Sequence, residues 1–262
     1  MYEGAVNWSS SPGRLAKVSA LLGVMLLPTS VTIAQQTAAK PAVEPKAVEA
    51  LRGMGAYLRS LKEFSVQGEG ARDEIVKSGQ KIQINGTVAY QVRAPDHLRA
   101  EIKTDRKQRE FIYDGKTLTV YAPRMHYYAT VNAPPTIGAM LDSAQDRYGL
   151  EFPIADLFLW GTNKDESSKL TYASLVGPST INGIECDQYA FRQPGVDWQL
   201  WIQKGNAPLP IHIVITSRDN AAQPQYAATL KWDTQAKVSD ETFAFVPPKD
   251  ASKIMIVSSR FR

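Results

Sequence analysis

The chain has 262 residues, and its 44% hydrophobic content is enough to fill the core of one large domain or two small ones. Its net charge of +4 is not gathered into the basic stripe typical of nucleic-acid-binding proteins, so we predict no nucleic-acid partner. The densest basic stretch, "KTDRKQRE" at 103–110, is interrupted by Asp105 and Glu110 and indicates a solvated turn.

Residues 1–34 have the features of a secretory signal peptide. Arg14 and Lys17 precede "VSALLGVMLLP", an apolar run of about ten residues that is too short to span a bilayer. We predict cleavage after Ala34, a short linker at 35–44 and no integral membrane segment in the mature protein; a retained membrane anchor is the alternative. Cleavage removes Arg14, Lys17 and Glu3, which leaves 28 basic and 25 acidic side chains and a net charge of +3.

The mature chain opens with a predicted amphipathic helix that begins near Pro45. Its apolar residues recur every three or four positions, at Val48, Leu51, Met54, Leu58 and Leu61. From Phe64 the hydrophobic period changes to two, which predicts six successive strands separated by turn residues. These strands cover 64–76, 81–92, 97–104, 109–114, 116–122 and 126–131.

The step Asp114-Gly115 lies between two of these strands and predicts a tight hairpin. A two-residue type I′ turn requires positive φ at both central residues, which Asp-Gly tolerates well. This turn would place Phe111 opposite Leu118 and gather Phe111, Leu118 and Val120 on one apolar face. That face must cover other apolar residues.

A helical interruption is predicted at 135–160. The double proline at 134–135 ends the strands and starts a helix, because proline suits a first helical turn. "PIADLFLWG" at 153–161 predicts a second, short and strongly apolar helix. Five more strands follow at 169–178, 180–193, 196–204, 210–219 and 224–234.

The pattern as a whole predicts one mainly β domain over 45–258 with about eleven antiparallel strands. Either two sheets form a sandwich, or one long sheet curls around the helices. The apolar helices in the middle of the chain favour the second arrangement, because the inner face of a curled sheet must be covered by apolar side chains. The single cysteine, Cys186, cannot form an intrachain disulfide and is interpreted as a small buried hydrophobe.

Four segments carry a resemblance to a known group of proteins. They are "YDGKTLTVYAP" (113–123), "TINGIECDQYAF" (180–191), "LWIQKGNAPLPIHI" (200–213) and "SDETFAFVPPKDASKI" (239–254). In this order and spacing they resemble the LolA/LolB-like superfamily of periplasmic lipoprotein carriers, and within it a family of predicted periplasmic proteins of unknown function. The resemblance covers roughly residues 45–258.

The resemblance implies an unclosed β-barrel of about eleven strands with helices in its mouth and an apolar cavity between them. It also implies a periplasmic location and a greasy ligand: a lipid, an acyl chain or a lipoprotein anchor. The chain lacks the lipid-attached cysteine of the outer-membrane receptor member, which favours a soluble role.

No catalytic or metal-binding constellation is visible in the sequence. His97, His126 and His212 are isolated from one another and from carboxylates or cysteines at metal-ligand spacing. Neither a Gly-x-Ser-x-Gly elbow nor a phosphate-binding loop occurs. We therefore predict a binding protein with no metal and no cofactor, and keep a hydrolase with scattered active-site residues as the third hypothesis.

The leading hypothesis is a carrier that holds an apolar ligand between the curled sheet and its helices. The second is an envelope sensor or assembly factor that binds a protein partner. Pockets and ordinary cores are lined by the same residue types, so the sequence leaves open which one these side chains form. The predicted cavity-lining residues are Phe111, Leu118, Val120, Ile137, Met140, Leu141, Leu157, Phe158, Trp160 and Trp198.

Overall fold

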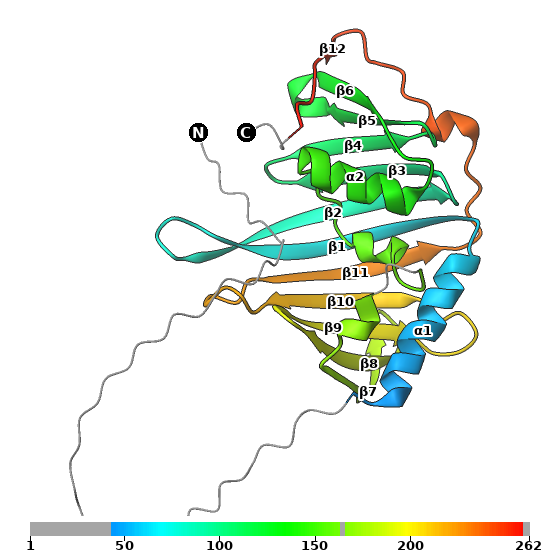
Figure 1. Ribbon diagram of the computed structural model, residues 1–262, viewed down its shortest axis with the longest axis vertical. Coiled ribbons are helices and arrows are strands. Elements are labelled where there is room, and N and C mark those ends of the chain that lie inside the picture. The colour runs from blue at the N-terminus through cyan, green and yellow to red at the C-terminus, as the bar shows by residue number, and fades with distance from the viewer. Residues whose placement is uncertain (1–42, 163–165, 259–262) are drawn as a thin grey trace, which may run out of the picture. The chain divides into compact units, whose positions relative to one another are not determined.

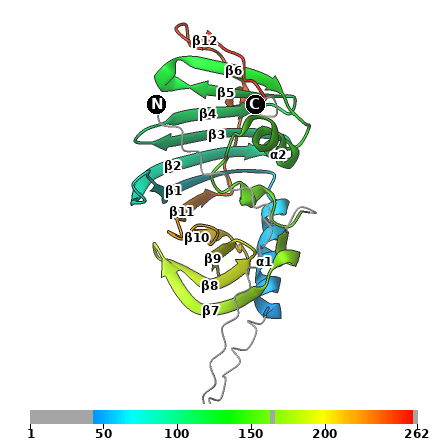
Figure 2. The same ribbon diagram turned by 60° about the vertical axis from the view of Figure 1, so that its left-hand side comes forward.

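The computed structural model describes residues 43–162 and 166–258, in which one long sheet carries its main helices on one face (Figures 1 and 2). The predicted signal peptide and most of the predicted linker lie outside these residues. The helical elements are α1 (Pro45–Ser60), η1 (Pro123–Met125), α2 (Ile137–Tyr148), η2 (Ala155–Phe158), η3 (Glu166–Lys169) and η4 (Asp240–Phe243).

Twelve strands form the sheet within the described residues. Listed along the chain they are β1 (Glu63–Ile75), β2 (Lys81–Arg93), β3 (His97–Thr104), β4 (Gln108–Tyr113), β5 (Thr117–Ala122), β6 (Tyr127–Asn132), β7 (Tyr172–Ile181), β8 (Ile184–Gln193), β9 (Val196–Gln203), β10 (Pro210–Ser217), β11 (Gln225–Asp233) and β12 (Ser252–Lys253).

The sheet is open rather than closed into a barrel. Its spatial order is β12-β6-β5-β4-β3-β2-β1-β11-β10-β9-β8-β7, so β12 and β7 are the two edges. The eleven long strands pair antiparallel, as the sequence predicts, whereas β12 pairs parallel to β6 and makes the sheet mixed. This twelfth strand has two residues, too few for a periodic pattern to reveal it.

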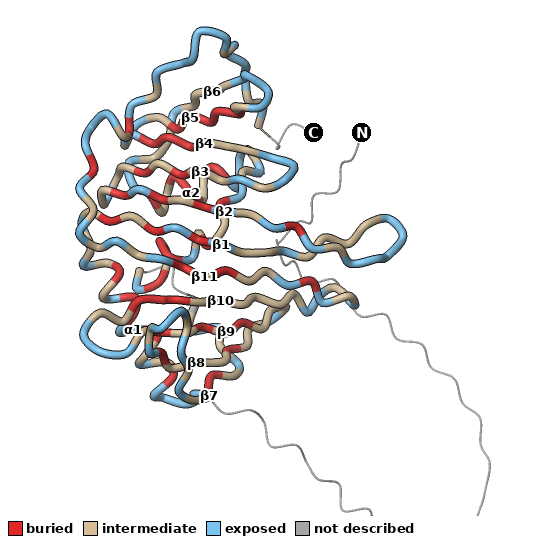
Figure 3. The backbone as a smooth tube through the Cα atoms, turned by 180° about the vertical axis from the view of Figure 1, so that it is seen from behind, coloured by how far each residue is buried: buried red, intermediate tan, exposed pale blue. Residues whose placement is uncertain are grey.

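Helix α1 confirms the predicted amphipathic pattern. Ala47, Leu51, Met54 and Leu58 are buried and lie one turn apart, so they form a stripe that faces the sheet. The reverse side of the sheet, seen in Figure 3, is not covered by α1 or α2. The hydrophobic core therefore lies between the helices and the inner face of the curled sheet.

The hairpin at Asp114-Gly115 is confirmed, but its predicted register is wrong. Phe111 pairs with Val120 instead of Leu118, and Tyr113 pairs with Leu118. The turn is longer because the Asp114 carboxylate accepts hydrogen bonds from the N–H groups of Lys116 (2.9 Å) and Thr117 (2.6 Å). A shift of two residues keeps every side chain on its predicted face, so Phe111, Leu118 and Val120 still share the buried side.

The helical interruption differs from its prediction at both of its helices. Helix α2 begins at Ile137 rather than at the double proline, because the Thr136 hydroxyl caps it by accepting from the N–H of Ala139 (3.3 Å). The predicted second helix is a single 3-10 turn, η2. Positive φ at Ile154 (52°) and Gly161 (74°) bends the chain on either side and limits the helix to one turn.

The C-terminal segment, coloured orange to red in Figure 1, runs along one end of the strands to the edge of the sheet. Phe243 is buried against His97, with ring centroids 5.1 Å apart, and Arg93 lies over the same ring. Phe245 contacts Tyr121 and Tyr128 in the same way. The two phenylalanines of the "SDETFAFVPP" motif therefore fasten the chain end to the sheet, which is a structural role.

Candidate ligand-binding site

An apolar cavity of about 420 Å³ opens where the ends of several elements meet on the helix-covered face. The C-terminal end of α1, the first turn of α2, η2 and the neighbouring ends of β1 and β2 all contribute. Its lining residues are Leu58, Arg59, Leu61, Lys62, Phe64, Val92, Ala94, Pro95, Thr136, Ile137, Gly138, Ala139, Phe158, Leu159 and Thr162.

The first turn of α2 is fixed beside the end of β2 by a backbone hydrogen bond. The N–H of Ile137 donates to the carbonyl of Pro95 over 2.9 Å. The Ile137 side chain is buried and lines the cavity, while the Thr136 cap orients the same turn. The wall formed by α2 is therefore held to the tight turn between β2 and β3.

The opposite wall, formed by η2, is held to α1 in two ways. The Arg59 guanidinium donates hydrogen bonds to the carbonyls of Phe158 (2.8 Å) and Leu157. One turn earlier, the backbones of Gly55 and Gly161 approach so closely that a Cβ at Gly55 would lie 2.7 Å from the Gly161 nitrogen. Only residues without side chains allow this contact.

Arg59 carries its charge into a partly apolar setting. Its Nε is buried without a hydrogen-bond partner, and burial lowers the pKa of its guanidinium. No carboxylate is among the residues that line the cavity. Arg59 and Lys62 are its two basic side chains, so the cavity combines an apolar lining with uncompensated positive charge.

All ten predicted lining residues are buried in one continuous hydrophobic cluster, yet they separate into two groups. Ile137 and Phe158 line the cavity, and Phe158 packs edge-to-face against Tyr90 with centroids 5.4 Å apart. The other eight are not among the lining residues, and their role as ligand contacts stays a prediction: Phe111, Leu118, Val120, Met140, Leu141, Leu157, Trp160 and Trp198.

Aromatic stacking accounts for the position of the two tryptophans. The Trp198 ring stacks on two rings. Its centroid lies 4.1 Å from that of Phe191 and 6.2 Å from that of Trp160. This stack fills the space between η2 and the strands β8 and β9. On the other half of the sheet Phe111 contacts Phe152 at 4.4 Å in a similar way.

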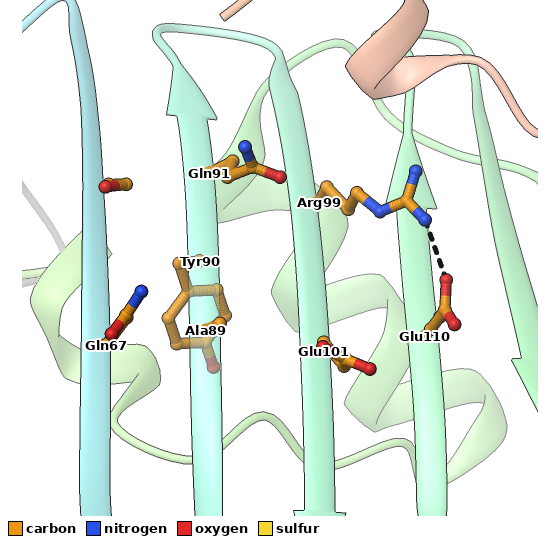
Figure 4. Close-up of a pocket in the computed structure, with 8 residues that line it drawn as sticks. Gln67, Ala89, Tyr90, Gln91, Arg99, Glu101 and Glu110 are labelled. Carbon is orange, nitrogen blue, oxygen red and sulfur yellow. Dashed lines mark hydrogen bonds and ion pairs between the residues drawn. The ribbon is translucent and has the colours of Figure 1, made fainter. Parts of the chain in front are cut away.

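A second, polar cavity of about 290 Å³ lies on the strands β1 to β4 (Figure 4). Arg99 and Glu110 form an ion pair across it (2.8 Å), and Glu101 accepts hydrogen bonds from Gln108 and pairs with Lys103. These charges already neutralise one another. The apolar cavity is therefore the stronger candidate for a ligand.

The three histidines are spread over the sheet and serve local contacts. His97 bonds to Asp96 and His126 to Asp250, each at 2.7 Å, and both contacts are exposed or half-buried. His212 bonds to the Thr229 hydroxyl (2.8 Å), and burial lowers its pKa. Across residues 43–162 and 166–258, no group of three or more His, Cys, Asp or Glu side chains is placed to hold a metal ion.

None of the described helices is long and apolar enough to cross a membrane.

Several solved structures are similar to this chain. The lipoprotein LppX of Mycobacterium tuberculosis is 15% identical, with a TM-score of 0.48 over 75% of this chain and 100% of that one. LprF of Mycobacterium bovis is 14% identical, with a TM-score of 0.43 over 80% and 100%. The LolA superfamily protein NE2245 of Nitrosomonas europaea is 9% identical, with a TM-score of 0.35 over 76% and 97%. Likenesses this distant say nothing about what the chain binds.

None of the curated proteins matches the sequence closely enough to count as a relative. A family model does match, over residues 47–257, and its description is "Predicted periplasmic protein (DUF2092)". This confirms the resemblance to a family of predicted periplasmic proteins, and the description agrees with the periplasmic location that the sequence predicts. Because the match covers most of the 262 residues, the chain belongs to the DUF2092 family of predicted periplasmic proteins.

Proposed function

We propose that this protein binds an apolar ligand, such as an acyl chain, in the cavity between α1, α2, η2 and the sheet, and carries it through the periplasm. The observation that carries the proposal is the cavity itself. Its volume of about 420 Å³ falls within the range of roughly 300–1,000 Å³ that is usual for small-molecule sites, and most of its lining is apolar. The periplasm is aqueous, and free acyl chains are poorly soluble in water. A protein that binds the chain in an apolar cavity keeps it out of contact with water.

A substitution that adds a large side chain to the cavity wall, and so fills part of the cavity, tests this proposal. Gly138 lines the cavity in the first turn of α2, and the nearest atom to a Cβ added there is Cδ2 of Leu159 at 3.9 Å. We expect Gly138→Leu to place a side chain in the ligand's space and to lower the affinity for a fluorescent fatty acid at least tenfold. Fluorescence titration of the folded protein measures this.

Gly53→Leu is the matched control for the filled variant. Gly53 is an exposed helical glycine of α1, and a Cβ there would meet no atom within 4 Å. This variant should bind the fatty acid as the wild type does. A wild type that binds no fatty acid, or equal binding by both variants, would contradict the proposal.

Native mass spectrometry of protein isolated from its own periplasm would identify a retained ligand by its mass. The alternative function, an envelope sensor or assembly factor, expects a retained protein partner and an empty cavity in the same experiment. The hydrolase hypothesis expects neither. The three hypotheses predict different retained species, so one preparation distinguishes them.

A further inference from the structure

The rim of the apolar cavity is the place where its positive charge gathers. Arg59 is in the last turn of α1, Lys62 follows shortly after the helix ends at Ser60, and both line the cavity. Lys62 is exposed, whereas Arg59 is half-buried. The charges therefore mark one region of the lining, while Phe64, Val92 and the other apolar residues form the rest.

Neither cation has an acidic partner among the described residues. Arg59 donates to two backbone carbonyls, and its buried Nε donates to nothing. The Lys62 side chain makes no hydrogen bond or ion pair there, although elsewhere on the sheet lysines such as Lys81 and Lys204 pair with aspartates. A partly buried cation without an acidic partner is unfavourable, so an anion from outside the chain would stabilise Arg59 at this site.

The first turn of α2 adds a third source of positive potential to the same lining. Thr136, Ile137, Gly138 and Ala139 all line the cavity at the start of this 12-residue helix. The N–H groups of Ile137 and Ala139 have acceptors in Pro95 and Thr136. The N–H of Gly138 has no acceptor among the described residues, and free N–H groups at a helix N-terminus favour an anion.

We propose that the ligand is an amphiphile with an anionic head group, whose apolar chain fills the cavity while its carboxylate or phosphate lies among Arg59, Lys62 and the first turn of α2. This inference rests on the proposed carrier function and narrows its ligand class. A neutral lipid of equal chain length would leave the same cations unpaired. Selectivity for the charged form is therefore the property that distinguishes this inference from simple apolar binding.

Three probes of the same chain length measure this selectivity: a fluorescent fatty acid, its methyl ester, and the corresponding alkyl phosphate. We expect the acid or the phosphate to bind at least tenfold more tightly than the ester, because charge-assisted hydrogen bonds are strong in a partly buried site. The tighter of the two anionic probes indicates whether the head group is a carboxylate or a phosphate. Added salt should weaken the two anions and leave the ester unchanged.

Substitutions of single cations test whether this selectivity comes from the cavity. Lys62→Gln should weaken the anionic probes about threefold or more and leave the ester unchanged, since the Lys62 side chain has no other described partner. Arg52→Gln is the matched control, because Arg52 is an exposed cation of α1 that lies outside the cavity lining. Equal affinities for acid, phosphate and ester would overturn this inference and leave the carrier function standing. If no probe binds at all, both proposals fall.

Discussion

At the scale of single residues, Gly115 is a position where the backbone conformation restricts which residue types are tolerated. Its φ of +85° lies in the left-handed region, as the Asp-Gly step predicts. A Cβ at this position would also lie 3.3 Å from Oδ2 of Asp96, which belongs to the neighbouring turn. Conformation and contact therefore both favour glycine here, although the predicted two-residue turn is wrong.

Gly115→Val should lower the free energy of unfolding by about 1–3 kcal/mol, the usual penalty for a strained backbone position. Chemical denaturation measures the change. Gly115→Asn is the matched variant and should be milder, because asparagine tolerates positive φ better than a β-branched residue does. If valine and asparagine give the same stability as glycine, positive φ is not required at this turn.

His212 links stability to pH through its burial. Burial lowers its pKa below the ordinary value of 6.5, so the folded protein holds the neutral ring while the unfolded chain binds a proton more readily. The unfolded state binds more protons between these two pKa values, and stability therefore rises with pH in that window. His212 contributes its full stabilisation above pH 6.5, and this is lost as the pH falls towards the folded pKa.

Unfolding free energies of the wild type and His212→Gln, measured from pH 7.5 down to pH 5, test this effect. The wild type should lose more stability on acidification than the variant does. Asp114 and Asp197 also have lowered pKa values, but their window begins below the ordinary 3.8 and does not overlap. Parallel pH profiles for the two proteins would show that His212 titrates normally when folded.

At the scale of elements, the sequence predicts the features that follow from a repeating pattern of residues, and it misses the features that depend on a single contact. Alternating residues predict all eleven long strands, because a sheet buried on one face requires that period. The start of α2 depends on the Thr136 cap, and the hairpin register depends on the Asp114 carboxylate. Each is one hydrogen-bonding side chain among many similar ones, so periodicity cannot reveal it.

The contact between α1 and η2 is the clearest of these single-contact features. Gly53 and Gly55 are two residues apart on the same helix, but only Gly55 touches another backbone. We expect Gly53→Ala to stabilise the protein by about 0.5–1 kcal/mol through helix propensity. Gly55→Ala should instead destabilise it by about 1–3 kcal/mol, because its Cβ would overlap Gly161.

Thermal unfolding of this pair isolates the contact, since both variants make the same chemical change. The same preparations report on the cavity, because η2 forms its wall. Gly55→Ala should also change the affinity for a fluorescent fatty acid, whereas Gly53→Ala should not. Equal stability of the two variants would show that η2 does not depend on close contact with α1.

At the scale of the whole molecule, the candidate site could be predicted only in part. Apolar residues on the inner face of a curled sheet build core and cavity alike, so Trp198 and Phe158 look equivalent in the sequence. The structure separates them through the aromatic stack on β8 and β9. The sequence does not single out Arg59 and Lys62, because cations at or just beyond the end of a helix commonly serve the helix dipole.

We expect the apolar segment around η2 to move when a ligand enters, with Trp160 or Phe158 lining the cavity. Phe158 lines it, whereas Trp160 is 8% exposed and stacks on Trp198 beside the cavity. A lid that opens must break the stack and the Arg59 hydrogen bonds, and its movement stays a prediction. Substitutions of these two neighbouring aromatic residues therefore distinguish an effect on folding stability from an effect on ligand binding.

Trp160→Ala should lower the free energy of unfolding by about 3–5 kcal/mol, as for other large buried aromatic residues, and should leave the affinity for a fluorescent fatty acid nearly unchanged. Phe158→Ala should lower the stability by a similar amount and also alter the affinity, because its ring borders the ligand. Denaturation and fluorescence titration of the two variants measure both quantities. The opposite pattern for Trp160→Ala, with small loss of stability and weak binding, would mean that the tryptophan closes over the ligand as part of a mobile lid.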